Sequence, residues 1–143
     1  MRLESKGVVR PPPKLAGPAQ AVSAEIQSWP KIRAATHWYL YDRTQVDGAD
    51  FYVGARELGH IHLDGEIHLA LTPGLAQRLI EAGLAAEFPW GSDWVQAPIR
   101  TKVEARRAIW LFRLGYDRIR GAGIRELRER IRREAEQATP VIS

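Results

Sequence analysis

A single hairpin constrains the fold of this chain more than any other feature. Polar and apolar residues alternate from residue 59 to residue 71, on both sides of Asp64-Gly65, which is a turn signal. A two-residue turn would mix polar and apolar groups on both faces. A three-residue loop over 63–65, with Gly65 left-handed, pairs His60 with His68 and separates the two kinds of residue. We therefore expect an antiparallel hairpin with one apolar face and one histidine face.

The remaining patterns predict an α+β fold. Alternating and β-branched segments predict strands at 36–41, 50–55, 57–63, 66–71, 84–88 and 93–97, and Asp47-Gly48 is expected as the turn before the second of these. Helical spacing and capping residues predict helices over 21–29, from Thr72-Pro73 to Gly83, from Thr101 to about residue 119, and over 124–138. The expected architecture is one domain, with an antiparallel meander sheet of five to six strands packed against a long C-terminal helix and shorter helices.

The chain divides into three parts by composition. Residues 1–20 are rich in proline and lack apolar periodicity, so we expect a flexible or partly extended arm. Residues 21–120 would form the α+β domain. Residues 121–143 would form a basic amphipathic helix and a tail.

Composition excludes several classes of function. The 143 residues include no cysteine, which rules out disulfides, thiolate catalysis and cysteine-ligated metals. No apolar stretch approaches the roughly 20 residues of a membrane span, and the first 20 residues lack the apolar region of a signal peptide. We therefore expect a cytoplasmic protein without a membrane partner.

The positive charge is concentrated at the C-terminal end. Residues 100–143 carry 12 Lys and Arg against 6 Asp and Glu, whereas residues 1–99 carry 9 against 11. Such a face could attract nucleic acid, but Glu126 with Arg130 and Glu129 with Arg133 are spaced as salt bridges of an exposed helix. We do not expect nucleic acid as a partner. A homodimer through the apolar seam of this helix (Ile124, Leu127, Ile131) is an alternative.

The histidine face is the main candidate for a functional site. Opposed residues of a hairpin have Cβ atoms about 4.5 to 5.5 Å apart, so His60, His62, His68 and Glu66 would lie close together. Three interpretations stay open at this point: a metal site at the three histidines, an ordinary polar sheet face, or a metal-free pocket in which a histidine acts as general base. No cofactor is expected, because metal binding is not the favoured interpretation.

Other residues can contribute to a binding pocket. Trp38 and Trp94 could contact a flat aromatic ligand, since ligand clefts are mostly apolar with a few polar groups. Arg56 and Glu57 precede the histidine strand and either face solvent or point into the same site. We expect a small aromatic molecule as the ligand.

Two segments resemble the luciferase-domain family, which contains the fungal luciferases and many small bacterial proteins. They are residues 109–117 and the string Phe51-Tyr52-Val53-Gly54-Ala55-Arg56-Glu57-Leu58-Gly59-His60-Ile61-His62, which is followed by Asp64-Gly65. The resemblance implies an enzyme that adds dioxygen to a hydroxypyrone or another electron-rich phenolic, without flavin or metal. It implies His60, His62, Asp64, Arg56 and Glu57 as catalytic residues, with His62 as the base and an arginine holding the substrate anion. The alternative is a binding module that carries out no reaction.

Overall fold

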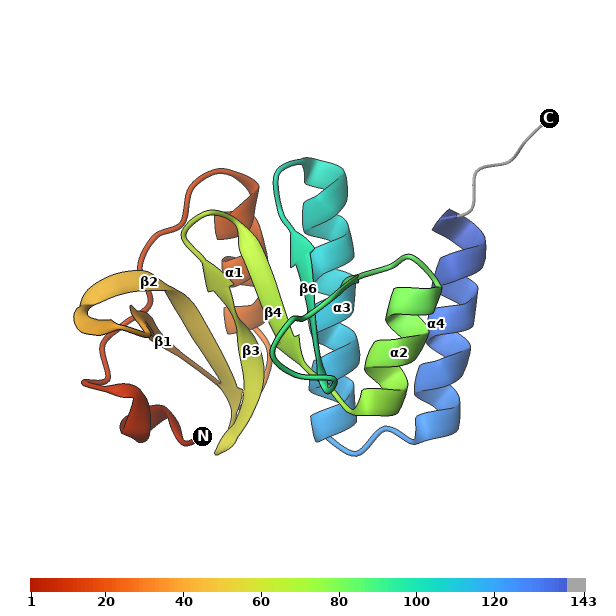
Figure 1. Ribbon diagram of the computed structural model, residues 1–143, viewed down its shortest axis with the longest axis horizontal. Helices are drawn as coiled ribbons and strands as arrows, with labels where there is room; N and C mark the ends of the chain where they lie inside the picture. Colours follow the sequence, from red (N-terminus) through yellow and green to blue (C-terminus); the bar gives the residue numbers. More distant parts are fainter. Residues whose placement is uncertain (139–143) are drawn as a thin grey trace.

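The computed structural model describes residues 1–138, which form a six-stranded antiparallel sheet with helices (Figure 1). The strand order is β1-β2-β3-β4-β6-β5, so the first four strands form the predicted meander. The strands are β1 (Ile32–Tyr39), β2 (Asp42–Val53), β3 (Arg56–His62), β4 (Glu66–Ala70), β5 (Ala86–Glu87) and β6 (Trp94–Pro98). The α+β prediction is confirmed.

Within the described residues 1–138, four α-helices and one short 3₁₀ helix accompany the sheet. They are η1 (Leu3–Lys6), α1 (Pro18–Gln27), α2 (Pro73–Glu81), α3 (Lys102–Ile119) and α4 (Ile124–Ala138). Helices α1 and α3 cover one face of the sheet, and α2 and α4 lie beyond its β6 side (Figure 1). The predicted caps are present, because the hydroxyls of Thr72 and Thr101 accept hydrogen bonds from the backbone N–H groups of Leu75 and Glu104.

The hairpin has the register expected from its alternation. His60 pairs with His68, Ile61 pairs with Ile67, and Gly65 adopts a φ of 86° in the loop. Ile61 and Ile67 are fully buried under the helices. The apolar face therefore belongs to the core, and the histidine face is turned to the opposite side of the sheet.

The predicted turn at Asp47-Gly48 is wrong. These residues lie inside β2, a 12-residue strand, and the chain instead reverses at Leu40-Tyr41. His37 pairs with Gly48 and Trp38 pairs with Val46, so Asp47 is an extra residue in a β-bulge. A glycine with positive φ serves a bulge as well as a turn, and the local sequence does not distinguish the two.

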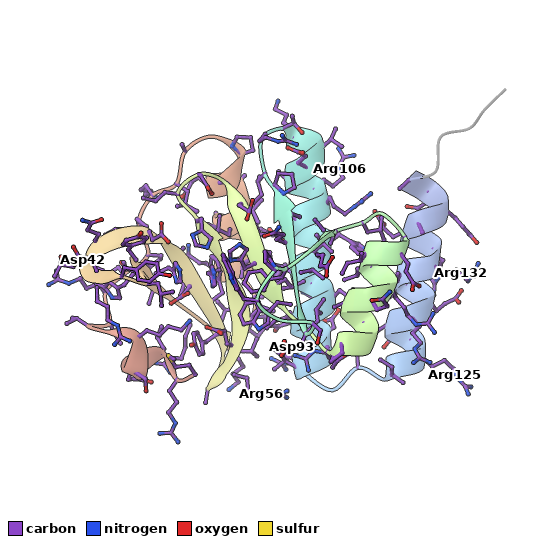
Figure 2. The ribbon with its side chains drawn as sticks, viewed as in Figure 1. Asp42, Arg56, Asp93, Arg106, Arg125 and Arg132 are labelled. Atoms are coloured by element: carbon purple, nitrogen blue, oxygen red, sulfur yellow. The ribbon has the colours of Figure 1, made fainter. Side chains whose placement is uncertain are left out.

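Helix α4 is part of the main hydrophobic core. Leu127 and Ile131 are 1 % and 4 % exposed, whereas Ile124 is 48 % exposed. The apolar seam is therefore largely covered within one chain. Figure 2 shows Arg125 and Arg132 on the outer side of this helix, so a dimer through α4, which stays a prediction, would have to use a charged surface.

The Pro-rich N-terminal segment lies along the sheet. The backbone N–H of Thr36 donates to the carbonyl of Arg10 at 2.8 Å, and Leu3 packs with Ala35 and Tyr52 in a second buried cluster. The structure describes the partly extended form of the predicted arm, and the boundaries of the three predicted parts stay predictions. Among residues 1–138, no helix has the length and apolar character needed to cross a membrane.

Candidate functional site

All four histidines of the chain gather on the open face of the sheet. His37 comes from β1, His60 and His62 from β3, and His68 from β4. The rings of His37 and His60 are stacked with centroids 4.0 Å apart, and the centroids of His62 and His68 are 4.5 Å apart. His60 Nε2 and His62 Nε2 lie 3.0 and 3.1 Å from His68 Nδ1. We call these four side chains the histidine cluster.

Three carboxylates hold the outer edges of the histidine cluster. Asp50 Oδ1 lies 2.8 Å from His37 Nδ1, and Asp47 Oδ2 lies 2.9 Å from His62 Nδ1. Glu66 Oε1 lies 3.1 Å from His68 Nε2. An ionised carboxylate can only accept, so each of these three ring nitrogens carries a hydrogen, and in a neutral ring the other nitrogen then presents a lone pair.

The bulge in β2 explains how two aspartates reach the same cluster. Residues 47 and 50 would point to opposite faces of a regular strand, because side chains alternate. The extra residue shifts the alternation, so both carboxylates face the histidines. Gly48 is required there, since its φ is 154° and an added Cβ would lie 1.9 Å from the carbonyl oxygen of Ile61.

A second bulge in β3 brings Glu57 to the same face as His60. Phe51 pairs with Gly59 and Tyr52 pairs with Glu57, which leaves Leu58 as the extra residue. Glu57 forms an ion pair with Lys6 from the N-terminal segment, and its Oε2 lies 3.0 Å from the Tyr52 hydroxyl. Burial, with a further effect from the Glu57 carboxylate, raises the pKa of Tyr52, so this hydroxyl stays protonated.

The histidines in the middle of the cluster are poorly hydrated. Burial, followed by the charges of His37 and His62, lowers the pKa of His60 well below 6.5. Burial also lowers the pKa of His68, although the hydrogen bond to Glu66 opposes the shift. His60 Nδ1 is buried and has no hydrogen-bond partner among the described residues, with Asp50 Oδ1 at 3.7 Å. Both rings are therefore held in the neutral form, which leaves lone pairs available.

A cavity of about 290 Å³ opens beside the histidine cluster. Its lining includes Met1, Lys6, His37, Trp38, Tyr39, Leu40, Arg43, Glu57, His60, Phe88 and Trp94. The walls are mostly apolar, while two imidazoles and the charged groups of Lys6, Arg43 and Glu57 supply the polar part, a combination typical of small-molecule sites. The N-terminal segment, β1 and the loop after β5 contribute to these walls together with β3.

The structure brings most of the predicted site residues together. His60, Glu57, Trp38 and Trp94 line the cavity, and the ring centroid of Trp94 lies 5.9 Å from that of His60. His62, His68 and Glu66 complete the cluster behind it, as the hydrogen bonds above show.

Two predicted catalytic residues lie elsewhere. Arg56 is the first residue of β3 and is exposed, as Figure 2 shows. Its charge acts on Arg118 of α3, on the other side of the sheet. Asp64 is exposed in the hairpin loop, where its carboxylate accepts the backbone N–H of Glu66 at 3.0 Å. The structure does not bring either side chain to the cavity.

Several site residues were missed from the sequence. His37, Asp47, Asp50, Lys6 and Phe88 lie far from the hairpin along the chain. A local signal existed only for His37, since a polar residue between β-branched and aromatic neighbours indicates a strand face. The sequence pattern predicts a turn at Asp47, and Lys6 lies in the arm that is predicted to be flexible or partly extended.

The arrangement supports two kinds of chemistry. The Asp50–His37 pair resembles the carboxylate–imidazole pairs of general bases, in which the carboxylate fixes the ring and its tautomer. His37, His60 and His62 can also each place one ring nitrogen within 4.8 Å of the others, as can the ligand atoms of Asp50, Glu57 and His60. Imidazole and carboxylate are ligands of first-row transition metals.

Comparisons with known proteins agree with the resemblance seen in the sequence. No curated protein and no solved structure matches the chain. One family model matches, that of the luciferase domain, over residues 55–115. The matched segment runs from the start of β3 into α3 and contains three of the four histidines. Over residues 55–115 the chain is therefore similar to the luciferase domain.

Proposed function

We propose that this protein is a luciferase-like oxygenase that binds a hydroxypyrone or another phenolic molecule in the cavity and adds dioxygen to it. The observation that carries the proposal is the lining of the cavity, which combines apolar aromatic side chains with two imidazoles of the histidine cluster. The luciferase-domain match supports the same type of reaction. Consistent with the family resemblance, the reaction would use neither a flavin nor a metal.

The aromatic walls suit a planar substrate. The rings of Phe88 and Trp94 have centroids 6.0 Å apart, and Trp94 also approaches His60. Trp38 is held in the wall because its indole N–H donates to the carbonyl of Val8 at 2.8 Å. Rigid aromatic side chains offer a large contact area at low entropic cost, so these walls favour a ligand with a flat ring.

Geometry favours His37 over His62 as the base. His37 lines the cavity, its Nδ1–H donates to the fully buried Asp50 carboxylate, and its Nε2 presents a lone pair. His62 directs its Nε2 toward His68 instead. Lys6 and Arg43 also line the cavity, so these cations, rather than Arg56, are placed to offset the charge of a substrate anion.

The proposed reaction needs no further reactant than dioxygen. His37 Nε2 accepts the proton of the enol or phenol hydroxyl, which leaves a substrate anion with an electron-rich ring carbon. That carbon transfers two electrons to dioxygen as a carbon–oxygen bond forms, and the product is a peroxide anion. The His37 imidazolium then returns its proton to the terminal oxygen, so the base is restored and a hydroperoxide is released.

Oxygen consumption tests the proposal. The full chain is offered hydroxypyrones and simpler phenolics in an oxygen electrode, next to His37→Gln, whose amide can still donate to Asp50. We expect the wild type to consume dioxygen with at least one of these compounds and His37→Gln to lose about 100-fold or more of the rate. Trp94→Leu should weaken substrate binding, whereas Trp90→Leu should not, because Trp90 is 82 % exposed and outside the cavity lining.

Each outcome bears on the proposal. Ligand binding detected by thermal shift without dioxygen consumption would overturn the oxygenase and favour the non-catalytic binding module. Consumption that is unchanged in His37→Gln would overturn the assignment of the base. If no phenolic raises the unfolding midpoint of the wild type, the cavity does not bind this class of molecule.

A further inference from the structure

The hydrogen bonds of the histidine cluster leave more lone pairs than hydrogens in its interior. His37 and His62 each direct an N–H outward to an aspartate, and His68 directs its N–H to Glu66. In the neutral rings the inner nitrogens, His37 Nε2, His62 Nε2 and His68 Nδ1, are therefore acceptors. The interior of the cluster is rich in acceptors although it is half-buried, and unpaired polar groups in such a position are costly.

The conflict is sharpest between His62 and His68. Their two acceptor nitrogens lie 3.1 Å apart, and His68 Nδ1 also lies 3.0 Å from His60 Nε2. The single lone pair of His68 Nδ1 can accept only one hydrogen. If His60 donates it, His62 Nε2 faces another lone pair and His60 Nδ1 becomes a buried acceptor without a partner among the described residues. A cation between the rings removes the conflict.

The charges around the cluster favour a cation. Three carboxylates contact its rings, and Asp50 is fully buried. Lys6 lies 3.4 Å from Asp50, but the same ammonium is paired with Glu57. The remaining negative charge is held within a few ångströms of the inner nitrogens, where attraction to a positive ion is strong.

From this arrangement we infer a binding site for one divalent first-row transition-metal ion such as Zn²⁺ or Co²⁺, with His37, His60 and His62 as its ligands. One nitrogen of each lies within 4.8 Å of the other two, and a tetrahedral ion with bonds of about 2.0 to 2.1 Å needs them about 3.3 Å apart. Rotation of the rings can supply this change. Asp50 and Asp47 orient His37 and His62 from behind, in the manner of the carboxylate–histidine pairs that support metal sites.

This site goes beyond the proposed oxygenase and is independent of it. The ion and the proposed base use the same lone pair of His37, so they exclude each other. A bound metal ion would therefore inhibit the reaction. Metal binding is measured without any substrate, and for this reason either proposal can fail while the other stands.

Metal titration of the full chain tests the site. After treatment with EDTA and its removal, the wild type is titrated with Zn²⁺ by calorimetry and with Co²⁺ by visible absorption. We expect one ion per chain and the visible band of imidazole-bound Co²⁺. His62→Ala and the conservative His62→Gln should weaken binding by more than about 100-fold, and Asp47→Asn by about 10- to 100-fold. Asp42→Asn removes a charge from the other end of β2, where Asp42 contacts Thr44, and should bind as the wild type does.

Two results would overturn the inference. One is a folded, metal-free wild type that binds neither ion at concentrations up to about 1 mM. The other is a His62→Gln variant, folded by circular dichroism, with the affinity of the wild type. Equal losses in Asp42→Asn and Asp47→Asn would show that general negative charge, rather than the orientation of His62, governs binding, and would overturn the role of Asp47.

Discussion

Single residues at the two bulges decide whether the carboxylates reach the histidines. Gly48 and Gly59 both adopt a φ of 154° next to the extra residue of their strand. An added Cβ would lie 1.9 Å from the backbone oxygen of Ile61 at Gly48 and 2.3 Å from that of His68 at Gly59. Because both obstacles are backbone atoms of the neighbouring strand, no side-chain rotation can relieve the clash.

Gly48→Ala should therefore destabilise the protein strongly. The strand pairing must shift to admit the methyl group, so we expect a loss of about 3 kcal/mol or more in the free energy of unfolding, measured by urea denaturation. Gly74→Ala is the matched control, since a Cβ added there meets no atom within 4 Å and the residue occupies the first turn of α2. That control should change stability by less than about 1 kcal/mol. Similar losses in both variants would contradict the role of the bulge.

Asp50 is expected to act on the reaction through His37. In Asp50→Asn the amide can donate to His37 Nδ1, which would move the ring hydrogen to Nε2 and remove the base. If the oxygenase proposal holds, kcat should fall by about 100-fold or more while KM changes little, as for other carboxylates that fix a histidine tautomer. Steady-state oxygen consumption separates the two constants. A rise in KM alone would instead assign Asp50 to substrate binding.

Among the larger elements, α4 and the N-terminal segment are the two that composition describes least well. Both are polar or Pro-rich along most of their length, yet each is attached by a few buried apolar residues. Leu3 anchors the N-terminal segment in a cluster with Ala35 and Tyr52, and Leu127 and Ile131 anchor α4. The first attachment also brings Lys6 to the cavity.

The attachment of α4 can be measured by one substitution. Leu127→Ala should lower the free energy of unfolding by about 2 to 4 kcal/mol, because a side chain only 1 % exposed leaves a void in the core. Ile124→Ala, at a position 48 % exposed in the same helix, should cost less than about 1 kcal/mol. If the two substitutions cost the same, Leu127 is not the anchor of this helix.

At the scale of the whole molecule, the site depends on strands that are distant in sequence. His37 and His62 are 25 positions apart, and the metal ion and the base proposed above need β1, β2 and β3 to be assembled. Ligands that bind only the folded chain should therefore raise its unfolding midpoint. Because the metal ion needs ligands from several strands, metal binding reports whether the site is assembled.

Added Zn²⁺ should both stabilise the protein and suppress the proposed reaction. One equivalent should raise the thermal midpoint of the wild type but not that of His62→Gln, because the ion is lost from the variant. Oxygen consumption should fall in the same range of Zn²⁺ concentration and return after EDTA. Activity that rises with metal instead would contradict metal-free catalysis and leave the binding site itself intact.

Local pattern alone determined the hairpin, the capped helices and the luciferase-like resemblance. Alternation places Ile61 and Ile67 on one face of the hairpin and His60 and His68 on the other, since a shift of one residue would bury the histidines in the core. Thr72 and Thr101 cap their helices by accepting hydrogen bonds from residues only three positions away. These features depend on neighbours in the chain or across one turn. For the same reason the His60–His68 pair and the nearby Glu66 were predictable, while Asp47 and Asp50 were not.

Only the tertiary structure decided the rest of the site. Asp47 and Asp50 point to the same face of the sheet only because β2 contains a bulge, and that bulge is defined by the pairing of β2 with β1 and β3. No residue near Asp47 distinguishes the bulge from a turn. His37 and Lys6 join the cluster across the sheet, and Arg56 and Asp64 are turned away from it by strand alternation and by the hairpin loop. Contacts between distant segments are set by packing of the whole core, so a sequence read along its length contains the residues of this site but not their arrangement.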